Sequence, residues 1–489
     1  MSNEKKKLHP VTAIINVVKA LKDLLFPIII ILVANGFNLN FDYKDENFFS
    51  EMVPLLILVV VVVWTMVNGL IKWITFSYWF EDRELRVEYG LFVKKKRYIP
   101  FERIQNLNYK EGIFHRFFKL VQVQVETAGS KNGKPEAELT AVTREAADEI
   151  EIQMKRAKEQ GVVEEDSQIQ NTVEASSTPI HKMKIPELLL LATTSSGIGV
   201  VLAGVFAVIS QFAEFIPFDR IYDEMAFLLK YSFIVIAILI AMGLLLTWII
   251  SVGITCLNYY NFTVTKEQER LIITRGLIEK KRVTIPLHRV QAIKIVENPL
   301  QQLFGLASVA VESAGGGFSG EADKKIILFP LIAKKEAIQP LMALFPDYEF
   351  TMAPSVQPPK KAQRFFYRMD FLWVTPTIAA LSYFLYPYGL LSLLLVILIL
   401  LLGKWQFKTT GYSIKGQQLT IVSRSISRVT FFAMKNRIQV TKGSQTYFQK
   451  RKEIGSAKIV VMSGMTGASA TVRHIDRQEI EKILKWYER

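Results

Sequence analysis

Long runs of apolar residues constrain this chain more than any other feature of its sequence. They fall in three pairs, at 21–37 and 53–73, at 188–212 and 231–257, and at 371–386 and 389–403. An α-helix needs about 20 apolar residues to cross about 30 Å of hydrocarbon, because every backbone polar group must be satisfied inside the segment. The sequence therefore predicts three membrane hairpins, each made of two helices.

The pairs differ in how well they meet this length. The second pair and the run 53–73 are long enough, whereas the run 21–37 has 17 residues and carries Lys22 and Asp23 near its start. The two runs of the third pair have 16 and 15 residues, which as helices reach only about 23 Å. The third pair is therefore either a tilted hairpin that starts near Phe365 or a shallow re-entrant hairpin.

Charged residues predict the orientation of the hairpins. The chain has 60 Lys and Arg against 45 Asp and Glu, a net charge of +15. The segments that join the first two pairs, 38–52 and 213–230, are acidic, while basic residues follow each pair. Because Lys and Arg are retained on the cytoplasmic side, we expect both termini and all three large polar regions to face the cytoplasm.

The polar regions repeat one another. The motif Ile-Pro-Phe-Glu-Arg-Ile-Gln at 99–105 returns as Ile-Pro-Leu-His-Arg-Val-Gln at 285–291, and Val-Gln-Val-Glu-Thr-Ala-Gly at 123–129 returns at 309–315 as Val-Ala-Val-Glu-Ser-Ala-Gly. Both matches are 186 residues apart, and a more divergent third copy keeps Arg437-Ile438-Gln439. The chain is therefore predicted to hold three copies of one domain-sized unit.

Each unit has a mostly β pattern. Alternation with period two predicts short strands, and apolar residues three and four apart predict closing helices at 145–158, 334–344 and 476–487. The predicted fold class is a mixed membrane protein, with three repeats of a transmembrane helical hairpin followed by a cytoplasmic antiparallel β-barrel or sandwich that a C-terminal helix caps. The expected boundaries are 1–76 for the N-terminal basic segment and hairpin 1, 77–160 for domain 1, 161–185 for a flexible linker, 186–257 for hairpin 2, 258–350 for domain 2, 351–364 for a Pro-rich linker, 365–405 for hairpin 3 and 406–489 for the divergent domain 3.

These motifs, with the segments Phe118-Lys119-Leu120 and Phe304-Gly305-Leu306 and the preceding spans, resemble the bacterial pleckstrin-homology-like (PH-like) membrane protein family. The three-copy layout is similar to that of its long YdbT-type members. The resemblance implies PH-like domains tethered to the bacterial cell membrane and a shorter YdbS-type partner with a single PH-like domain. It also implies a link to tolerance of membrane-active antimicrobial peptides, and it supplies no catalytic residue.

Two basic clusters are the candidate lipid-binding residues. They occupy equivalent places after a Gly-Leu turn and consist of Lys94, Lys95, Lys96 and Arg97 in copy 1 and Lys280, Lys281 and Arg282 in copy 2. Each Lys or Arg near an anionic leaflet contributes about 1 kcal/mol before screening, so a cluster could hold its domain against anionic lipid. The alternative is that the clusters only set the topology, and one cluster can do both.

The repeated polar residues of the motifs are expected to be structural. They are Arg103, Gln105 and Glu126 in copy 1, Arg289, Gln291 and Glu312 in copy 2, and Arg437 and Gln439 in copy 3. An ion pair at a strand edge, between one of these arginines and a carboxylate such as Glu126 or Glu312, is favoured over ligand binding.

Catalytic and metal-binding patterns have no support in the sequence. None of the five histidines is spaced with another histidine and a glutamate as in a metalloprotease, and Cys256 lies in an apolar run without a nearby base. We therefore expect no metal, no cofactor and no enzymatic activity. Nucleic acid is disfavoured as a partner, because the hairpins hold the domains against lipid head groups.

The predicted function is that of a non-enzymatic multi-pass membrane protein. Its three domains are expected to bind anionic lipid head groups, a partner membrane protein, or both. The alternative is a transporter or export component for a peptide or lipid, which would require a water-accessible cavity with polar walls between the spans. The long runs carry no uncompensated charge at mid-span, which argues against ion-coupled transport.

Overall fold

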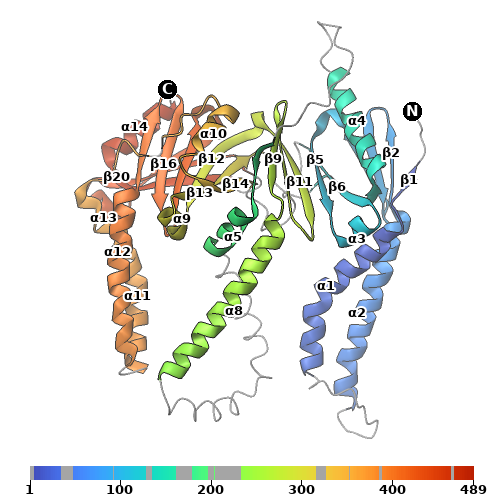
Figure 1. The fold of residues 1–489 in the computed structure, drawn as a ribbon, viewed down its shortest axis with the longest axis horizontal. Coiled ribbons are helices and arrows are strands. Elements are labelled where there is room, and N and C mark those ends of the chain that lie inside the picture. The colour runs from blue at the N-terminus through green and yellow to red at the C-terminus, as the bar shows by residue number, and fades with distance from the viewer. Residues whose placement is uncertain are drawn as a thin grey trace.

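The structure is a computed structural model of the chain. It describes residues 5–34, 48–91, 93–127, 135–160, 179–195, 203, 233–314, 326–351, 353–384, 388–463 and 467–488. Three β-rich domains stand side by side, and long helices leave all three toward the same side (Figure 1).

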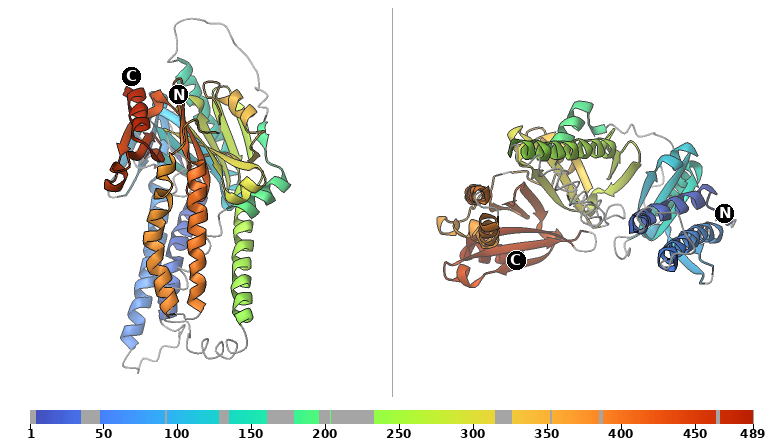
Figure 2. Two further views of the ribbon diagram at one scale, coloured as in Figure 1. Left: turned by 90° about the vertical axis from the view of Figure 1, so that its left-hand side faces the viewer. Right: turned by 90° about the horizontal axis from the view of Figure 1, so that it is seen from below.

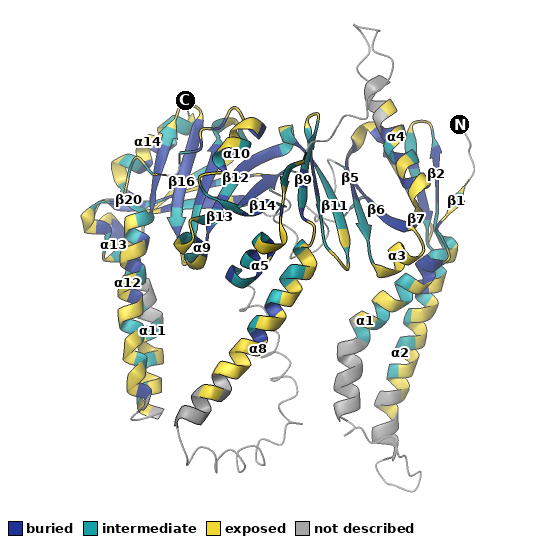
Figure 3. Ribbon diagram, viewed as in Figure 1, coloured by how far each residue is buried: buried dark blue, intermediate teal, exposed yellow. Residues whose placement is uncertain are grey.

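The long helices run roughly parallel to one another (Figure 2). They are α1 (Val11–Ala34) and α2 (Phe48–Thr75) below domain 1, α8 (Phe233–Tyr259) below domain 2, and α11 (Phe365–Phe384) and α12 (Leu394–Thr409) below domain 3. Segments 56–75 of α2, 241–259 of α8 and 389–409, which is α12 with the 3₁₀ turn before it, are long and apolar enough to cross a membrane. Their outer surfaces are largely exposed (Figure 3), as lipid-facing helices require.

The third pair of runs forms longer helices than the apolar runs alone predicted. Helix α11 begins at Phe365 and has 20 residues, and the 3₁₀ turn Tyr388–Leu393 leads directly into α12. A 20-residue helix is about 30 Å long. These lengths favour the extended hairpin over the shallow re-entrant one.

The expected span at 188–212 requires a correction. Helix α5 (Ile185–Thr194) ends where Ser195 takes an extended backbone, so 188–212 is not one continuous helix. Its side chains Leu188 and Leu191 are buried in the core of domain 2. Apolar residues that were assigned to a membrane span therefore serve the soluble core; residues 196–202 and 204–212 lie outside the described part of the chain.

Domain 1 consists of two sheets. The first holds β2 (Ser77–Glu81), β3 (Glu84–Tyr89) and β4 (Lys95–Pro100), and the second holds β5 (Ile104–Glu111), β6 (Leu120–Thr127) and β7 (Ala137–Thr143). The turn Phe101–Arg103 joins the sheets, α3 (Ile113–Phe117) joins β5 to β6, and α4 (Arg144–Gln160) follows β7. The core includes Leu85, Val123 and Ile150 from the two sheets and α4.

Domain 2 repeats this order, but its closing helix is short and α5 adds to its core. Its first sheet holds β9 (Thr263–Glu267), β10 (Arg270–Arg275) and β11 (Lys280–Pro286), and its second holds β12 (Val290–Glu297), β13 (Leu306–Ser313) and β14 (Ile326–Ala333), with α9 (Pro299–Leu303) between β12 and β13. The helix expected at 334–344 is shorter than predicted, because α10 spans only Ile338–Leu344. Helix α5 supplies further apolar side chains to this core.

Domain 3 completes the repeat. Its strands are β15 (Gly411–Lys415), β16 (Gln418–Arg424) and β17 (Arg428–Met434), followed by β18 (Ile438–Ser444), β19 (Ile454–Val461) and β20 (Ala468–Asp476), with α13 (Tyr447–Lys450) between β18 and β19 and α14 (Arg477–Glu488) at the end. Helix α14 packs its buried Ile480 and Ile483 against this core.

The sheets do not stop at the domain boundaries. Strand β5 of domain 1 pairs with β11 of domain 2, which gives one seven-stranded sheet, and β12 of domain 2 pairs with β17 of domain 3, which gives a six-stranded sheet. All of these pairings are antiparallel. Successive domains are therefore joined through their backbones.

Each domain also fixes the base of its membrane helices. A short segment before the helices pairs with the first strand after them: β1 (Lys6–Lys7) with β2, β8 (Pro179–Lys182) with β9, and Val356 with Tyr412 of β15. The chain therefore enters and leaves each membrane segment at the same strand.

The repeated Gly-Leu turn lies at this base. Gly90 and Gly276 have φ values of +108° and +105°, and a Cβ would come within 2.2 Å of the carbonyl oxygen of Val93 or 2.1 Å of that of Glu279. Only glycine fits such a backbone. The Gly90 N–H lies 3.3 Å from Oγ1 of Thr75 at the end of α2, so the basic residues that follow the turn start beside the membrane helices.

Candidate functional site

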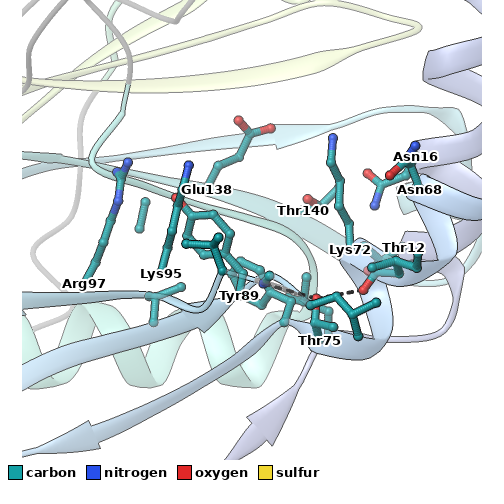
Figure 4. Close-up of a pocket in the computed structure, with 18 of the residues that line it drawn as sticks. Thr12, Asn16, Asn68, Lys72, Thr75, Tyr89, Lys95, Arg97, Glu138 and Thr140 are labelled. Carbon is teal, nitrogen blue, oxygen red and sulfur yellow. Dashed lines mark hydrogen bonds between the residues drawn. The ribbon is translucent and has the colours of Figure 1, made fainter. Parts of the chain in front are cut away.

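A cavity of about 1020 Å³ lies where the first hairpin meets domain 1. Its walls come from α1, α2, the β3–β4 turn, β4 and β7 (Figure 4). The site is therefore formed by residues far apart in the sequence that the repeat unit brings together.

Close contacts at the base of the hairpin position these walls. The Trp73 indole N–H donates to the Leu8 carbonyl at 3.0 Å, and the His9 N–H donates to the Ala141 carbonyl of β7 at 3.1 Å. Helices α1 and α2 approach closely at Gly69, where a Cβ would lie 3.2 Å from a methyl group of Val17. Both helices are thus fixed to the domain at the level of the cavity.

The charged lining of the cavity is mainly positive. Lys19 of α1, Lys72 of α2 and Lys95 of β4 line it and form no ion pair with any residue that the structure describes. Arg97 also lines it, but its guanidinium donates to the Glu136 carbonyl and lies 3.8 Å from the Glu136 carboxylate. Three cations are therefore left for an anion from outside the chain.

Glu138, the second acidic residue of the lining after Glu136, already has a hydrogen-bond partner. Glu138 accepts a hydrogen bond from Gln122 at 2.6 Å. Lys95 and Arg97 extend from β4 to the same side, as residues two apart on a strand do, and Lys72 lies on the opposite wall (Figure 4). The cations thus converge on the cavity from two sides.

The remaining lining is partly polar and partly apolar. Thr12 and Asn16 of α1 and Asn68 of α2 face the cavity, and the buried Thr12 hydroxyl has no hydrogen-bond partner among the described residues. Trp64 and Ile71 of α2 supply an apolar wall on the membrane side. A cavity whose lining combines cations with apolar side chains matches the two ends of an anionic amphiphile.

The first basic cluster is divided between two faces of β4. Lys95 and Arg97 line the cavity, whereas Lys94 and Lys96 do not, although Lys94, Lys95 and Lys96 are all exposed. Lys96 lies opposite Glu88 of β3. Lys5 donates to Glu88 at 2.8 Å, and this bond, with the charges of Lys96 and Lys94, lowers the pKa of the Glu88 carboxyl.

The second basic cluster lies at the junction of domains 1 and 2. Lys281 is 3.5 Å from the Glu279 carboxylate, and the Arg282 guanidinium lies 5.8 Å from the ring centre of Tyr109 in domain 1. Lys280 is exposed and lines, with Arg282, a smaller cavity of about 320 Å³ between the domains. Although the two clusters are equivalent in sequence, they have different surroundings.

The motif carboxylates lie at the two domain junctions. In domain 1, Glu126 accepts a hydrogen bond from Asn108 at 2.9 Å and faces the charge of Arg289 in domain 2. Burial raises the pKa of Glu126 to about 8. In domain 2, Glu312 forms an ion pair with Lys294 and accepts a hydrogen bond from Ser463 of domain 3.

The other motif residues have separate environments. Arg103 is exposed, the Arg437 charge lowers the otherwise raised pKa of Tyr348, and the backbone carbonyl of Gln439 accepts a hydrogen bond from Tyr487. Gln291 is buried and donates to the Arg289 carbonyl at 3.0 Å. The side chain of Gln105 lies outside the described residues.

Sequence reasoning missed a surface that all three domains share. The short helices between the first two strands of each second sheet lie on the side from which the membrane helices leave (Figure 1). Their region carries large exposed apolar side chains, namely Ile113, Phe114, Phe117 and Phe118 at α3, Leu300, Leu303 and Phe304 at α9, and Tyr447 and Phe448 at α13. The repeated Phe-Lys-Leu and Phe-Gly-Leu segments were a signal for this surface, but alone they gave it no role.

Within the described part of the chain, no three His, Cys, Asp or Glu side chains lie close enough together to hold a metal ion.

Comparison with known proteins gives two matches and one negative result. The model of the family described as Bacterial PH domain matches residues 23–158, 188–340 and 370–489. The UPF0699 transmembrane protein YdbT of Bacillus subtilis (strain 168) is 36% identical over 500 residues, which cover 100% of this chain and 99% of the relative. No solved structure matches.

Proposed function

Because the chain belongs to the bacterial PH domain family, we propose that it is a non-enzymatic membrane protein whose PH-like domains bind anionic lipid head groups on the cytoplasmic side. Its hairpins span the cell membrane, and each domain sits on the membrane surface with its closing helix over the core. A shorter membrane protein with a single PH-like domain is the proposed partner. Together they contribute to resistance against membrane-active antimicrobial peptides.

The observation that carries this proposal is the cavity at the base of the first hairpin. Lys19, Lys72 and Lys95 reach it without an ion-pair partner among the described residues, and apolar side chains of α2 line its membrane side. A phosphate group placed there would be held by charge-assisted hydrogen bonds, which are stronger than those between neutral groups. Its acyl chains would extend along α2 into the hydrocarbon.

The exposed apolar residues at α3, α9 and α13 support the same placement. They lie at the level where the membrane helices begin (Figure 1), and cationic residues such as Arg116, Lys119 and Lys450 lie among them. Apolar side chains flanked by cations are typical of surfaces that enter the interfacial region of an anionic membrane. All three domains would then rest on one leaflet.

The charge distribution supports the cytoplasmic orientation. Basic clusters lie on the domain side of the membrane helices, and the segments 38–52 and 213–230 are acidic. Positive charge near the ends of membrane helices favours the cytoplasmic side.

Lipid binding is tested with the full chain in nanodiscs of phosphatidylethanolamine with increasing phosphatidylglycerol, by native mass spectrometry of the retained lipids. The variant Lys72→Gln/Lys95→Gln removes two cavity cations, and at about 1 kcal/mol each we expect about a thirtyfold loss of affinity for phosphatidylglycerol. The matched control Lys94→Gln/Lys96→Gln removes the same charge from the adjacent stretch outside the cavity and should change affinity much less.

Two results would contradict the proposal. Equal losses in both variants would mean that the domain attracts anionic lipid only through its overall charge. Unchanged binding in both would reject the head-group site. Glycerol phosphate added as a competitor shows whether the cavity selects a membrane lipid or any soluble phosphate, since a soluble competitor should displace the lipid only weakly.

A further inference from the structure

The two junctions between domains obey one rule of strand pairing. In each, the first strand of a second sheet pairs with the third strand of the next domain's first sheet: β5 with β11, and β12 with β17. The register is also the same. Glu111 lies opposite Lys280 and Glu297 lies opposite Arg428, and these two pairs occupy equivalent places in the repeat.

Two strands that occupy these positions in the repeat, one in domain 1 and one in domain 3, do not pair with another domain among the described residues. Strand β4 is the domain 1 counterpart of β11 and β17, and it lies at the edge of its sheet. Strand β18 is the domain 3 counterpart of β5 and β12, and it also lies at an edge. Each pairs with one strand only within the described part of the chain.

The two edges differ in how they are protected. Strand β4 has the sequence Lys-Lys-Arg-Tyr-Ile-Pro, and positive charges together with a proline are the features by which proteins block pairing at an edge. Strand β18 has the sequence Ile-Gln-Val-Thr-Lys-Gly-Ser, with one charge and no proline. Strand β11, with the similar sequence Lys-Lys-Arg-Val-Thr-Ile-Pro, nevertheless pairs with β5, so these residues disfavour pairing without preventing it. The β18 edge is therefore the less protected of the two.

The side chains of β18 are exposed at places where the equivalent strand β12 is covered by a neighbouring domain. Val440 is 51% exposed, whereas Ala292, at the equivalent place in β12 where β17 covers it, is 0% exposed. The helix after the strand gives a second indication. Arg116 donates to the Leu277 carbonyl of the next domain, and Gln302 accepts from Arg424 of the next domain. Lys450 holds the same place after β18.

A second copy of this chain is a poor occupant of the β18 edge. In the register shared by both junctions, β4 of another copy would place Arg97 directly opposite Lys442. Like charges opposite each other destabilise a strand pair unless a carboxylate lies beside them.

At the first junction Lys110 lies opposite Lys281, and the Glu279 carboxylate in the preceding turn is 2.6 Å from Lys110 and 3.5 Å from Lys281. The turn before β4 has Val93 at the place of Glu279, so a second copy would bring no such carboxylate. The cations Lys450, Arg451 and Lys452 beside this edge favour a partner whose turn before the third strand offers carboxylates, as Glu279 does at the first junction.

We propose that β18 receives, by antiparallel strand addition, the third strand of the first sheet of one further PH-like domain carried by a different membrane protein. This inference rests on the partner half of the proposed function and names where and how that partner binds. Because the membrane helices of all three domains leave on one side (Figure 2), a fourth domain joined by the same rule would stand on the same membrane.

The test co-expresses the full chain with the proposed single-domain membrane protein and measures how much of it co-purifies in detergent. The variant Val440→Lys puts a charge on the exposed face of the open edge, and we expect co-purification to fall about tenfold, equivalent to about 1.4 kcal/mol. The matched control is Tyr98→Lys on β4, a residue that is 54% exposed at the other edge, and it should leave co-purification unchanged. Both variants should keep the melting temperature of the parent.

Photocrosslinking locates the contact. With benzoylphenylalanine at Val440, we expect an adduct on the third strand of the partner's first sheet, identified by mass spectrometry. An adduct with a second copy of this chain would overturn the choice of partner. If the β18 variant still co-purifies the partner, strand addition at β18 is wrong although the partner is correct. If the unaltered chain forms no complex, both the partner and the strand addition are rejected.

Discussion

The two domain junctions use equivalent strands in the same register, but they differ in what surrounds those strands. The junction of domains 2 and 3 has six paired residues and the junction of domains 1 and 2 has three. Phe432 of β17 lies in the core of domain 2, and Ala292 of β12 lies in the core of domain 3. At the other junction the contacts are polar, such as Lys110 with Glu279 at 2.6 Å. Domains 2 and 3 therefore share a core, whereas domain 1 is held by polar contacts.

The motif glutamates Glu126 and Glu312 also differ between the two junctions. Glu312 at the second junction has Lys294 as its ion-pair partner, and the equivalent of Lys294 in domain 1 is Asn108. Glu126 therefore has an amide where Glu312 has a cation, and burial raises its pKa to about 8. The first junction therefore holds a buried carboxyl with a raised pKa, whereas the second holds an ion pair. Variants with effects of different expected size test this difference.

The largest effect is expected from Phe432→Ala. This side chain is 0% exposed and packs in the core of the neighbouring domain, so its removal should cost about 4 kcal/mol of stability. Hydrogen exchange of the full chain should show that amides of domains 2 and 3 lose protection together, with domain 1 as the internal control. Loss confined to domain 3 would show that the two domains do not share a core.

The next effect is expected from Glu312→Gln. Lys294 and Glu312 are largely buried, with side-chain exposures of 16% and 5%, and the change leaves a buried ammonium without its counter-charge. We expect a loss of about 3 kcal/mol in the stability of domains 2 and 3, measured by thermal unfolding. Lys294→Met/Glu312→Leu, which removes both charges, should be less harmful than the single change, and the reverse order would argue against the ion pair.

In contrast to Glu312→Gln, the variant Glu126→Gln is expected to increase stability. A pKa of about 8 in the folded chain, against 4.5 for an unperturbed glutamate, means that the folded state holds its proton more tightly. Stability from this group is full below pH 4.5, falls as the pH rises and is lost by about pH 8. The amide should therefore stabilise domain 1 by about 2 kcal/mol at pH 9 and have little effect at pH 5. Melting curves at both pH values test this, and an equal effect at both would contradict the raised pKa.

Part of the fold could be predicted because its signals are local. The apolar runs located α2, α8 and α12, and the Gly-Leu motif located turns in which Gly90 and Gly276 take a positive φ. The continuation of sheets across domains could not be predicted, since alternation shows that a segment is a strand but not which strand lies beside it. Helix α5 was misassigned for a related reason, because leucines buried in a protein core and leucines in a bilayer have the same composition.

The candidate site was predicted in the same partial way. The basic cluster 94–97 was found, but only Lys95 and Arg97 line the cavity, because successive residues of a strand point to opposite faces. Asn16 and Asn68 were missed, since their part in the site depends on how α1 packs against α2. Local charge was visible in the sequence, and the three-dimensional convergence of charges was not.

The smallest effect, and the sharpest comparison of the junctions, comes from two ion pairs, one half-buried and one exposed. Lys110–Glu279 crosses the first junction at 2.6 Å, and Lys415–Glu349 links β15 to the end of domain 2 at 2.9 Å. Each should contribute about 0.5 kcal/mol. Lys110→Ala should nevertheless broaden the distance between spin labels on domains 1 and 2, since three residue pairs of β5 and β11 join their sheets. Lys415→Ala should leave the distance between domains 2 and 3 unchanged. Equal broadening in both would mean that the shared core does not stiffen the second junction.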